Sequence, residues 1–293
     1  ELVPRAPGAE PVDVEGAEGA WLMLPELGVS LPFPEVLSSL HDPWTVSRMR
    51  VMVLAGNEEA SPLQALLQAV SQPASAAGLA AVASADPQSP ALALARSAGV
   101  EAIVLADEGR KQSPTASDFS ARLEQTMQSS KAELLLVLDD VDSALLSRCF
   151  LSRHVGRVAV VHASLLPAFP GPSPITAALD SGVFVTGCTV CFAVPPASRD
   201  AGEQHCFGPQ VLQETLRIVA GDTPSALRAR LVAECEVPAV PRALLSIASG
   251  SVTLRHEGDR YGLGKSASSA GAAAAEGLLA AVPSPCRGSL DLR

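Results

Sequence analysis

Short, continuous apolar segments alternate with amphipathic segments of helical spacing through the middle of this 293-residue chain. The apolar segments have the length of strands and lack the alternation of a strand with one wet face, so both of their faces must be covered. The strands expected are 49–54, 102–105, 133–138 and 158–162, and the helices expected between them are 63–70, 91–98, 119–129 and 141–150. The sequence therefore predicts an α/β fold, a mostly parallel twisted sheet flanked by helices.

We assign the alternating strands and helices to one domain at residues 49–254. The segments on either side of this domain differ from it in composition. Residues 1–48 start rich in Pro, Gly and Glu and then carry isolated large apolar residues such as Trp21 and Trp44. We expect an N-terminal extension that wraps either over its own domain or onto a partner. Residues 255–293 are rich in Ala, Gly and Ser and are expected to form a flexible or partner-ordered C-terminal extension. Both extensions are predicted protein-contact segments.

The charge balance of the chain limits its partners. Lys and Arg number 21 against 31 Asp and Glu, a formal net charge of −10. Such a chain is a poor general binder of nucleic acid or of an anionic membrane surface. The sequence has no apolar run of about 18 residues, so no membrane span is expected. It starts at Glu1 instead of Met, which favours a processed chain in an organelle (mitochondrion or plastid), with the cytoplasm as the alternative.

Six cysteines are scattered through apolar segments, which argues against a disulfide scaffold. Cys188 and Cys191 form a CxxC pair inside a predicted strand, where residues three apart point to opposite faces. No second CxxC pair exists to complete a zinc site. We expect buried apolar cysteines and no metal.

Residues 160–171 carry the most specific pattern in the chain. They read Val-Val-His-Ala-Ser-Leu-Leu-Pro-Ala-Phe-Pro-Gly, which resembles the Asn-Ile-His-Pro-Ser-Leu-Leu-Pro-x-x-x-Gly segment of the formyltransferase family. Residues 185–190 match the family's next strand, Val-Thr-Gly-Cys-Thr-Val. Further matches in family order fall at 63–66, 77–79, 211–214, 221–224, 241–244 and 249–250. The chain is similar to glycinamide ribonucleotide transformylase, and this resemblance implies the Rossmann-like formyltransferase fold.

The resemblance also implies a catalytic site. In this family the amine of glycinamide ribonucleotide attacks the formyl group of 10-formyltetrahydrofolate; an Asn and a His polarise the formyl oxygen, and an Asp orients the His. Here His162 fills the His position and Val160 replaces the Asn. Valine has no donor, and the loss of one oxyanion donor typically costs about 10²–10³ in rate. We therefore expect impaired chemistry around a retained His162.

Two alignments of the family Asp remain open. Alignment from the left places Asp200, in Asp-Ala-Gly, on the family's Asp-Ala-Gly or Asp-Gly-Gly. Alignment from Gly208-Pro209 places Cys206 there instead. We favour Asp200, whereas Cys206 would leave the proton relay without a carboxylate.

The two ligand-binding loops of the family are also altered. Residues 56–63 replace the phosphate loop Gly-x-Gly-Ser-Asn-Leu, and Glu58 and Glu59 stand where a phosphate would bind. We expect these acids in the first turn of an ordinary helix with Pro62 at its first position. Gly56, Asn57 and Ser164 remain candidate substrate contacts.

The folate-binding segment is replaced in the same way. A Gly-Phe-Met-Arg-Ile-Leu-like stretch becomes 139–146, which carries Asp139, Asp140 and Asp142 and lacks the Arg. We expect Asp140 or Asp142 to cap a helix.

Two hypotheses follow. The first is a catalytically impaired formyltransferase-fold protein, with no cofactor, that serves as a structural or accessory subunit of a larger assembly. The alternative is a divergent active phosphoribosylglycinamide formyltransferase of purine biosynthesis that uses 10-formyltetrahydrofolate, with His162, Asp200 and Ser164 at its site.

Overall fold

The computed structural model describes residues 48–56, 60–105, 115–138, 141, 145–196, 206–257 and 260–265, together with the backbone of two short strands nearer the N-terminus. The chain divides into two compact units, Glu1–Ser47 and Arg48–Arg293. In the first unit, β1 (Trp21–Leu24) pairs with β2 (Val29–Pro32) in an antiparallel ladder.

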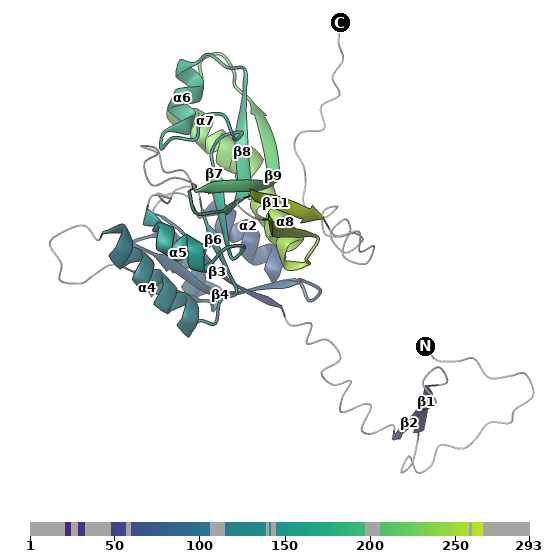
Figure 1. The fold of residues 1–293 in the computed structure, drawn as a ribbon. Coiled ribbons are helices and arrows are strands. Elements are labelled where there is room, and N and C mark those ends of the chain that lie inside the picture. The colour runs from purple at the N-terminus through teal and green to yellow at the C-terminus, as the bar shows by residue number, and fades with distance from the viewer. Residues whose placement is uncertain are drawn as a thin grey trace, which may run out of the picture. The chain divides into compact units, whose positions relative to one another are not determined.

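The second unit is built on a seven-stranded sheet in the order β5-β4-β3-β6-β7-β8-β9 (Figure 1). The strands are β3 (Met49–Leu54), β4 (Ala77–Ser84), β5 (Glu101–Val104), β6 (Leu134–Val137), β7 (Val158–His162), β8 (Val185–Ala193) and β9 (Phe207–Arg217). The first five strands in this order run parallel, and β8 and β9 run antiparallel to their neighbours. The prediction of a mostly parallel sheet is confirmed.

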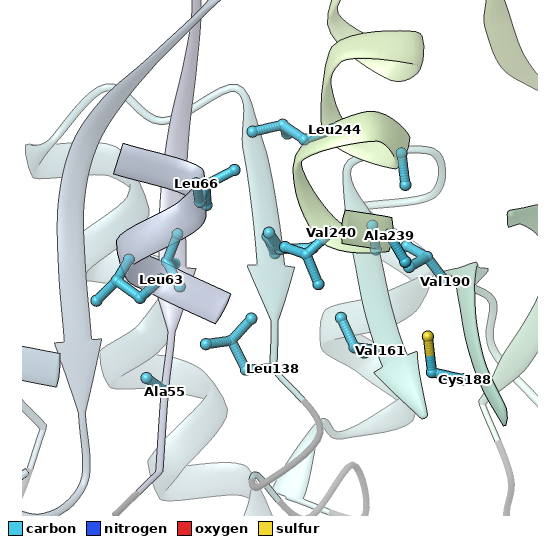
Figure 2. Close-up of a cluster of buried hydrophobic side chains, with 14 of the residues drawn as sticks. Ala55, Leu63, Leu66, Leu138, Val161, Cys188, Val190, Ala239, Val240 and Leu244 are labelled. Carbon is cyan, nitrogen blue, oxygen red and sulfur yellow. The ribbon is translucent and has the colours of Figure 1, made fainter. Parts of the chain in front are cut away.

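Helices cover both faces of this sheet. They are α2 (Ser61–Val70), α3 (Pro90–Ser97), α4 (Ala116–Ser129), α5 (Arg148–Arg153), α6 (Pro174–Asp180), α7 (Pro224–Leu231), the π-helical turn η2 (Val232–Glu236) and α8 (Val237–Ala248). On one face, Leu63 and Leu66 of α2 meet Val240 of α8 over Val161 of β7 (Figure 2); we call this the α2/α8 cluster. On the other face, Phe119 and Leu123 of α4 and Phe150 of α5 are buried together with side chains of β3, β4, β6, β7 and β8; we call this the α4/α5 cluster.

The structure differs from the sequence-based expectation in several elements. The predicted helix at 141–150 overlaps α5 but its start is wrong for the described residues: α5 starts at Arg148, because the Ser147 side chain accepts a hydrogen bond from the Phe150 N–H and caps the helix there. The strand β4 was also not predicted from the sequence. No helix in the described ranges is long and apolar enough to cross a membrane.

The predicted C-terminal boundary at residue 254 falls inside a strand. β10 (Val252–Glu257) pairs with β11 (Arg260–Lys265) in an antiparallel hairpin, and β11 contacts β9. Leu254 and Leu263 pack against the α2/α8 cluster. The first part of the predicted tail is therefore an integral part of the domain.

A buried histidine links α4 to α5. His154 is 7% exposed, and its ring packs on the Phe150 ring with centroids 4.6 Å apart and planes inclined by 41°. Its Nε2 lies 3.5 Å from Glu124 Oε1, and neither ring nitrogen has a hydrogen-bond partner within the described part of the chain. Burial lowers the pKa of His154, the nearby Arg157 adds to this effect, and Glu124 opposes it. His154 is therefore a neutral residue of the folded core.

This burial predicts that the folded domain loses stability in mild acid. The folded-state pKa of His154 lies below its ordinary value of 6.5, so the unfolded chain takes up the proton first as the pH falls. The free energy of unfolding should decrease between about pH 7.5 and about pH 5.5, a window above the range in which carboxylates titrate. Urea titrations at both pH values should show a smaller decrease in His154→Gln than in the wild type. An equal decrease in both proteins would contradict this assignment.

Gly187 lets β8 and β9 approach each other and the loop after β7. A Cβ at this position would overlap the backbone oxygen of Glu214 and lie 2.8 Å from Leu165 Cδ2. The backbone atom cannot move without breaking the Gly187–Thr215 register of the ladder. Only glycine fits here without distortion.

Gly187→Ala should therefore destabilise the domain by about 1–3 kcal/mol, the usual cost of overpacking a tight site. Chemical denaturation gives the measurement. Gly171→Ala is the matched control, since nothing lies within 4 Å of a Cβ built there. Equal stability of the two variants would show that the β8–β9 contact is not tight.

Candidate functional site

The candidate site lies at the carboxyl end of β7, where His162 is the last residue of the strand. This end adjoins the change of strand direction, because β7 pairs parallel with β6 and antiparallel with β8. His162 stands opposite Thr189 of β8 in the register. Carboxyl ends of parallel strands, next to a change in topology, are where α/β sheets place ligands.

The His162 ring is held on two sides. Its Nε2 lies 3.0 Å from the carbonyl oxygen of Phe169. A carbonyl only accepts hydrogen bonds, so Nε2 carries the proton in this contact. The ring also packs on the Phe207 ring, with centroids 4.6 Å apart and planes inclined by 42°. His162 is consequently only 7% exposed.

The loop after His162 is ordered by side-chain hydrogen bonds. The Thr189 hydroxyl donates to the Ser164 carbonyl at 2.6 Å and accepts from the Leu166 N–H at 3.0 Å. The Ser164 hydroxyl donates to the Ala168 carbonyl at 2.6 Å. Ser164, a predicted substrate contact, is fully buried and supports the loop that carries Phe169.

Two glutamines of β9 complete this network. The Gln213 side-chain amide donates to the Leu166 carbonyl at 2.9 Å and lies 2.9 Å from the Thr189 hydroxyl. The Gln210 amide donates to the same Leu166 carbonyl at 2.8 Å. The loop is thus fixed to β8 and β9 at the same time. We call this set of bonds the Thr189 network.

Val160, at the family's Asn position, and Cys206, one of the two candidates for the family's Asp position, are both buried. Val160 is 1% exposed and belongs to the α4/α5 cluster. Cys206 is buried in the same cluster and directly precedes Phe207, whose ring lies on His162. Asp200 lies outside the described residues. Among the described residues, the structure thus places the Phe207 ring on His162 and buries Val160 and Cys206 in one cluster.

The phosphate-loop residues are described only at their edges. Gly56 lies two residues after β3, and its carbonyl oxygen accepts a hydrogen bond from the Ser89 hydroxyl at 2.5 Å. α2 starts at Ser61 with Pro62 in its first turn, as expected, but its first turn has no acidic residue, because Ala60 is the N-cap. The expectation of acids in that turn is wrong.

Several predicted residues fall outside the described part of the chain. They are Asn57, Glu58, Glu59, Asp139, Asp140 and Asp142.

The CxxC pair is divided between the two faces of the sheet, as the strand period predicts. Cys188 lies in the α2/α8 cluster and Cys191 in the α4/α5 cluster. Burial raises the pKa of both thiols, so neither provides a thiolate at neutral pH. Among the described residues, no three His, Cys, Asp or Glu side chains are grouped so that they could hold a metal ion.

Sequence reasoning did not assign roles to Thr189, Gln210, Gln213 and Phe207. Thr189 and Gln213 lie inside the quoted motifs, so the motif positions were available but their contacts were not. Phe207 and Gln210 follow a segment whose alignment was open. No sequence signal placed the Phe207 ring on His162.

This strand-end geometry on a mostly parallel sheet agrees with the comparison of sequences. The profile of the family described as formyl transferase matches residues 49–244, and the chain belongs to this family.

Among the individual proteins that the chain resembles is one named for purine biosynthesis. The trifunctional purine biosynthetic protein adenosine-3 of Gallus gallus is 30% identical over 212 residues, which are 72% of this chain and 20% of that protein. This chain thus spans about a fifth of the length of that relative. The phosphoribosylglycinamide formyltransferase of Mycobacterium tuberculosis (strain ATCC 25618 / H37Rv) is 40% identical over 82 residues, 28% of this chain and 34% of that one.

Solved structures show the same fold. Glycinamide ribonucleotide transformylase 1 from Symbiobacterium toebii is 31% identical, with a TM-score of 0.60 over 73% of this chain and 92% of that chain. The predicted formyltransferase fold is confirmed.

The Thr189 network predicts a stability cost at one hydroxyl. Thr189→Val keeps the side-chain shape but leaves the buried Leu166 N–H and Ser164 carbonyl without this partner. We expect a loss of about 2–3 kcal/mol in the free energy of unfolding. Thr189→Ser retains the hydroxyl and should stay close to the wild type. A Val variant as stable as the Ser variant would contradict this role.

Proposed function

We propose that this formyl transferase-family chain does not catalyse formyl transfer and serves as a structural or accessory part of a larger assembly. The observation that carries the proposal is the apolar enclosure of His162: Phe207 packs on its ring, and Val160 and Cys206 are buried in the adjoining cluster. A developing oxyanion needs donors placed around it in advance. Aliphatic and aromatic side chains supply none.

The contacts of His162 also bear on proton transfer by this residue. Phe169 O lies 3.0 Å from His162 Nε2, so the proton on this nitrogen is already directed at a backbone carbonyl. If position 206 is the family's Asp position, a buried thiol stands in place of a carboxylate. A thiol cannot balance the charge of an imidazolium as a carboxylate does. On that alignment, no carboxylate at position 206 would face the retained histidine.

The hydrogen-bonded loop after β7 and the two hydrophobic clusters explain why the fold can stay stable without catalysing formyl transfer. None of the hydrogen bonds in the Thr189 network involves His162, and the side chains of both hydrophobic clusters are buried. Function resides in a site and not in the fold that carries it, so the fold can remain stable when the site is changed.

We further propose that residues 1–48 and 255–293 contribute contacts with protein partners. The described part of the first segment is a two-stranded ladder, and an isolated two-stranded hairpin is at best marginally stable in water. It gains stability when another surface covers it. In the second segment, Arg255, His256 and Arg260 of the β10–β11 hairpin are exposed on a chain of net charge −10.

The alternative is a divergent active phosphoribosylglycinamide formyltransferase that uses 10-formyltetrahydrofolate. One observation favours it: His162 is retained at the strand end, on a loop fixed by side-chain hydrogen bonds. Catalysis by this site would have to proceed without a donor at Val160.

A single-turnover assay with glycinamide ribonucleotide and 10-formyltetrahydrofolate separates the two functions. The wild type and His162→Ala should both give only the background rate of formyl transfer. His256→Ala, which changes an exposed histidine, is the matched control. The Symbiobacterium toebii transformylase verifies the assay. Turnover that decreases about 10²-fold or more in His162→Ala alone would establish the alternative.

A further inference from the structure

Three cationic residues lie around one turn at the amino end of the parallel strands. Lys131 belongs to the turn between α4 and β6, Arg50 is the second residue of β3, and Arg157 directly precedes β7. All three residues are exposed. Because β3, β6 and β7 are neighbouring parallel strands, their first residues lie at the same edge of the sheet. We call these residues the Arg50–Lys131–Arg157 cluster.

The backbone of this turn holds the two guanidinium groups close together. Arg50 Nε lies 3.2 Å from the carbonyl oxygen of Lys131. Arg157 Nη2 donates to the next carbonyl along the chain, that of Ala132, at 2.8 Å. Two consecutive carbonyl groups of one turn therefore connect Arg50 to Arg157, with Lys131 between them.

These hydrogen bonds leave the positive charges uncompensated, because a carbonyl accepts a hydrogen bond but carries no net charge. Glu133, the acid of this turn, accepts from the backbone N–H of Arg50 at 2.8 Å. The ion pairs of the described residues involve other arginines, such as Arg230, which pairs with Asp222 at 2.7 Å. Three cations thus surround a single carboxylate, and this edge of the sheet carries an excess of positive charge.

Lys131 occupies a position where glycine is usual. Its φ is 53°, a left-handed backbone conformation that disfavours any residue with a Cβ. It follows Ser130, the C-cap of α4, and the Ala132 N–H donates back across it to the Met127 carbonyl at 2.9 Å. This hydrogen bond belongs to the helix C-terminal motif that favours glycine. The two arginines already place positive charge at this helix end, so the strained lysine adds a charge beyond what the helix requires.

The acidity of the chain is concentrated away from this domain in the sequence. Residues 1–47 contain eight acidic residues and one basic residue, a charge of −7, which leaves −3 for residues 48–293. Charges farther apart than about 8 Å are largely screened at physiological ionic strength. Local charges therefore decide what binds to the cluster.

We propose that the Arg50–Lys131–Arg157 cluster binds an acidic segment of a partner protein, through consecutive Asp or Glu side chains. Both arginines direct Nε and Nη2 at the backbone, which leaves Nη1 of each for a carboxylate of the partner. The cluster surrounds one turn, so it matches a short run of carboxylates. This proposal gives a partner class to the accessory role proposed above, and it does not involve His162.

The surroundings of the cluster favour a protein over a nucleic acid or a membrane. Among the described residues, the large hydrophobic side chains with high exposure are Phe184, Val185 and Val219. They lie at the opposite end of the sheet, because β8 starts and β9 stops at the carboxyl end of β7. In the described part of the chain, the cluster therefore has neither an aromatic platform for bases nor an apolar anchor for a bilayer.

Fluorescence anisotropy of a labelled oligoglutamate peptide, titrated with the full chain, tests the proposal. The wild type should bind saturably, and the affinity should decrease as salt is added. Lys131→Gly should weaken binding by about 2- to 5-fold, the effect of one exposed ion pair. Lys131→Glu adds a like charge and should weaken it by about 10-fold. Arg217→Gln and Arg217→Glu make matched charge changes at the carboxyl end of β9 and should bind as the wild type does.

The stability of Lys131→Gly separates binding from folding. By chemical denaturation this variant should be at least as stable as the wild type, because glycine adopts a φ of 53° without strain. A wild type that does not bind the peptide, or Lys131 variants that bind it as tightly as the wild type, overturn the proposal. An oligothymidylate of equal charge that binds more tightly than the peptide overturns the choice of an acidic protein. Formyl transfer enters none of these measurements, so this proposal and the proposed function can fail independently.

Discussion

The reversal of strand direction between β7 and β8 is the constraint on which the rest of the site depends. Because β8 runs antiparallel, it brings Thr189 directly opposite His162, and the next strand brings Gln210 and Gln213 to the same place. One threonine hydroxyl then serves both a buried N–H and a buried carbonyl of the loop. Buried polar groups of a backbone must be satisfied, and here side chains from the antiparallel strands do this.

The same reversal creates the arm that ends in Phe184, Val185 and Val219. A parallel strand would need a crossover connection, whereas an antiparallel pair can extend beyond the sheet as a two-stranded arm. Gly187 permits the close approach of Glu214 and Leu165 at the base of the arm. The buried strand-end histidine and the two-stranded arm thus both follow from the same reversal of strand direction.

Much of the fold could be predicted from the sequence, because continuous apolar strands and helical spacing are local signals. β3, β6 and β7 were evident for this reason. β4 was not, since an alanine-rich segment such as Ala77–Ser84 has little strand propensity by itself, and only its position between β3 and β5 makes it a strand. The start of α5 depended on one cap, Ser147, that apolar spacing does not reveal.

The candidate site was predictable only where a motif fixes a position. His162 and Val160 follow from the quoted segment, and their burial agrees with a strand end in a parallel sheet. The contact of Phe207 with His162 depends on two segments more than forty positions apart, which no local pattern can bring together. The family assignment itself is secure from the match over residues 49–244.

We propose that apolar packing around His162 has replaced the polar environment of a formyl-transfer site. The ring-proton NMR signal of His162, identified by its absence in His162→Gln, reports on this site directly. With this apolar packing, the His162 signal should not move when glycinamide ribonucleotide and a folate analogue are added. A saturable shift with both ligands would show a competent binding site around His162 and would contradict the claim.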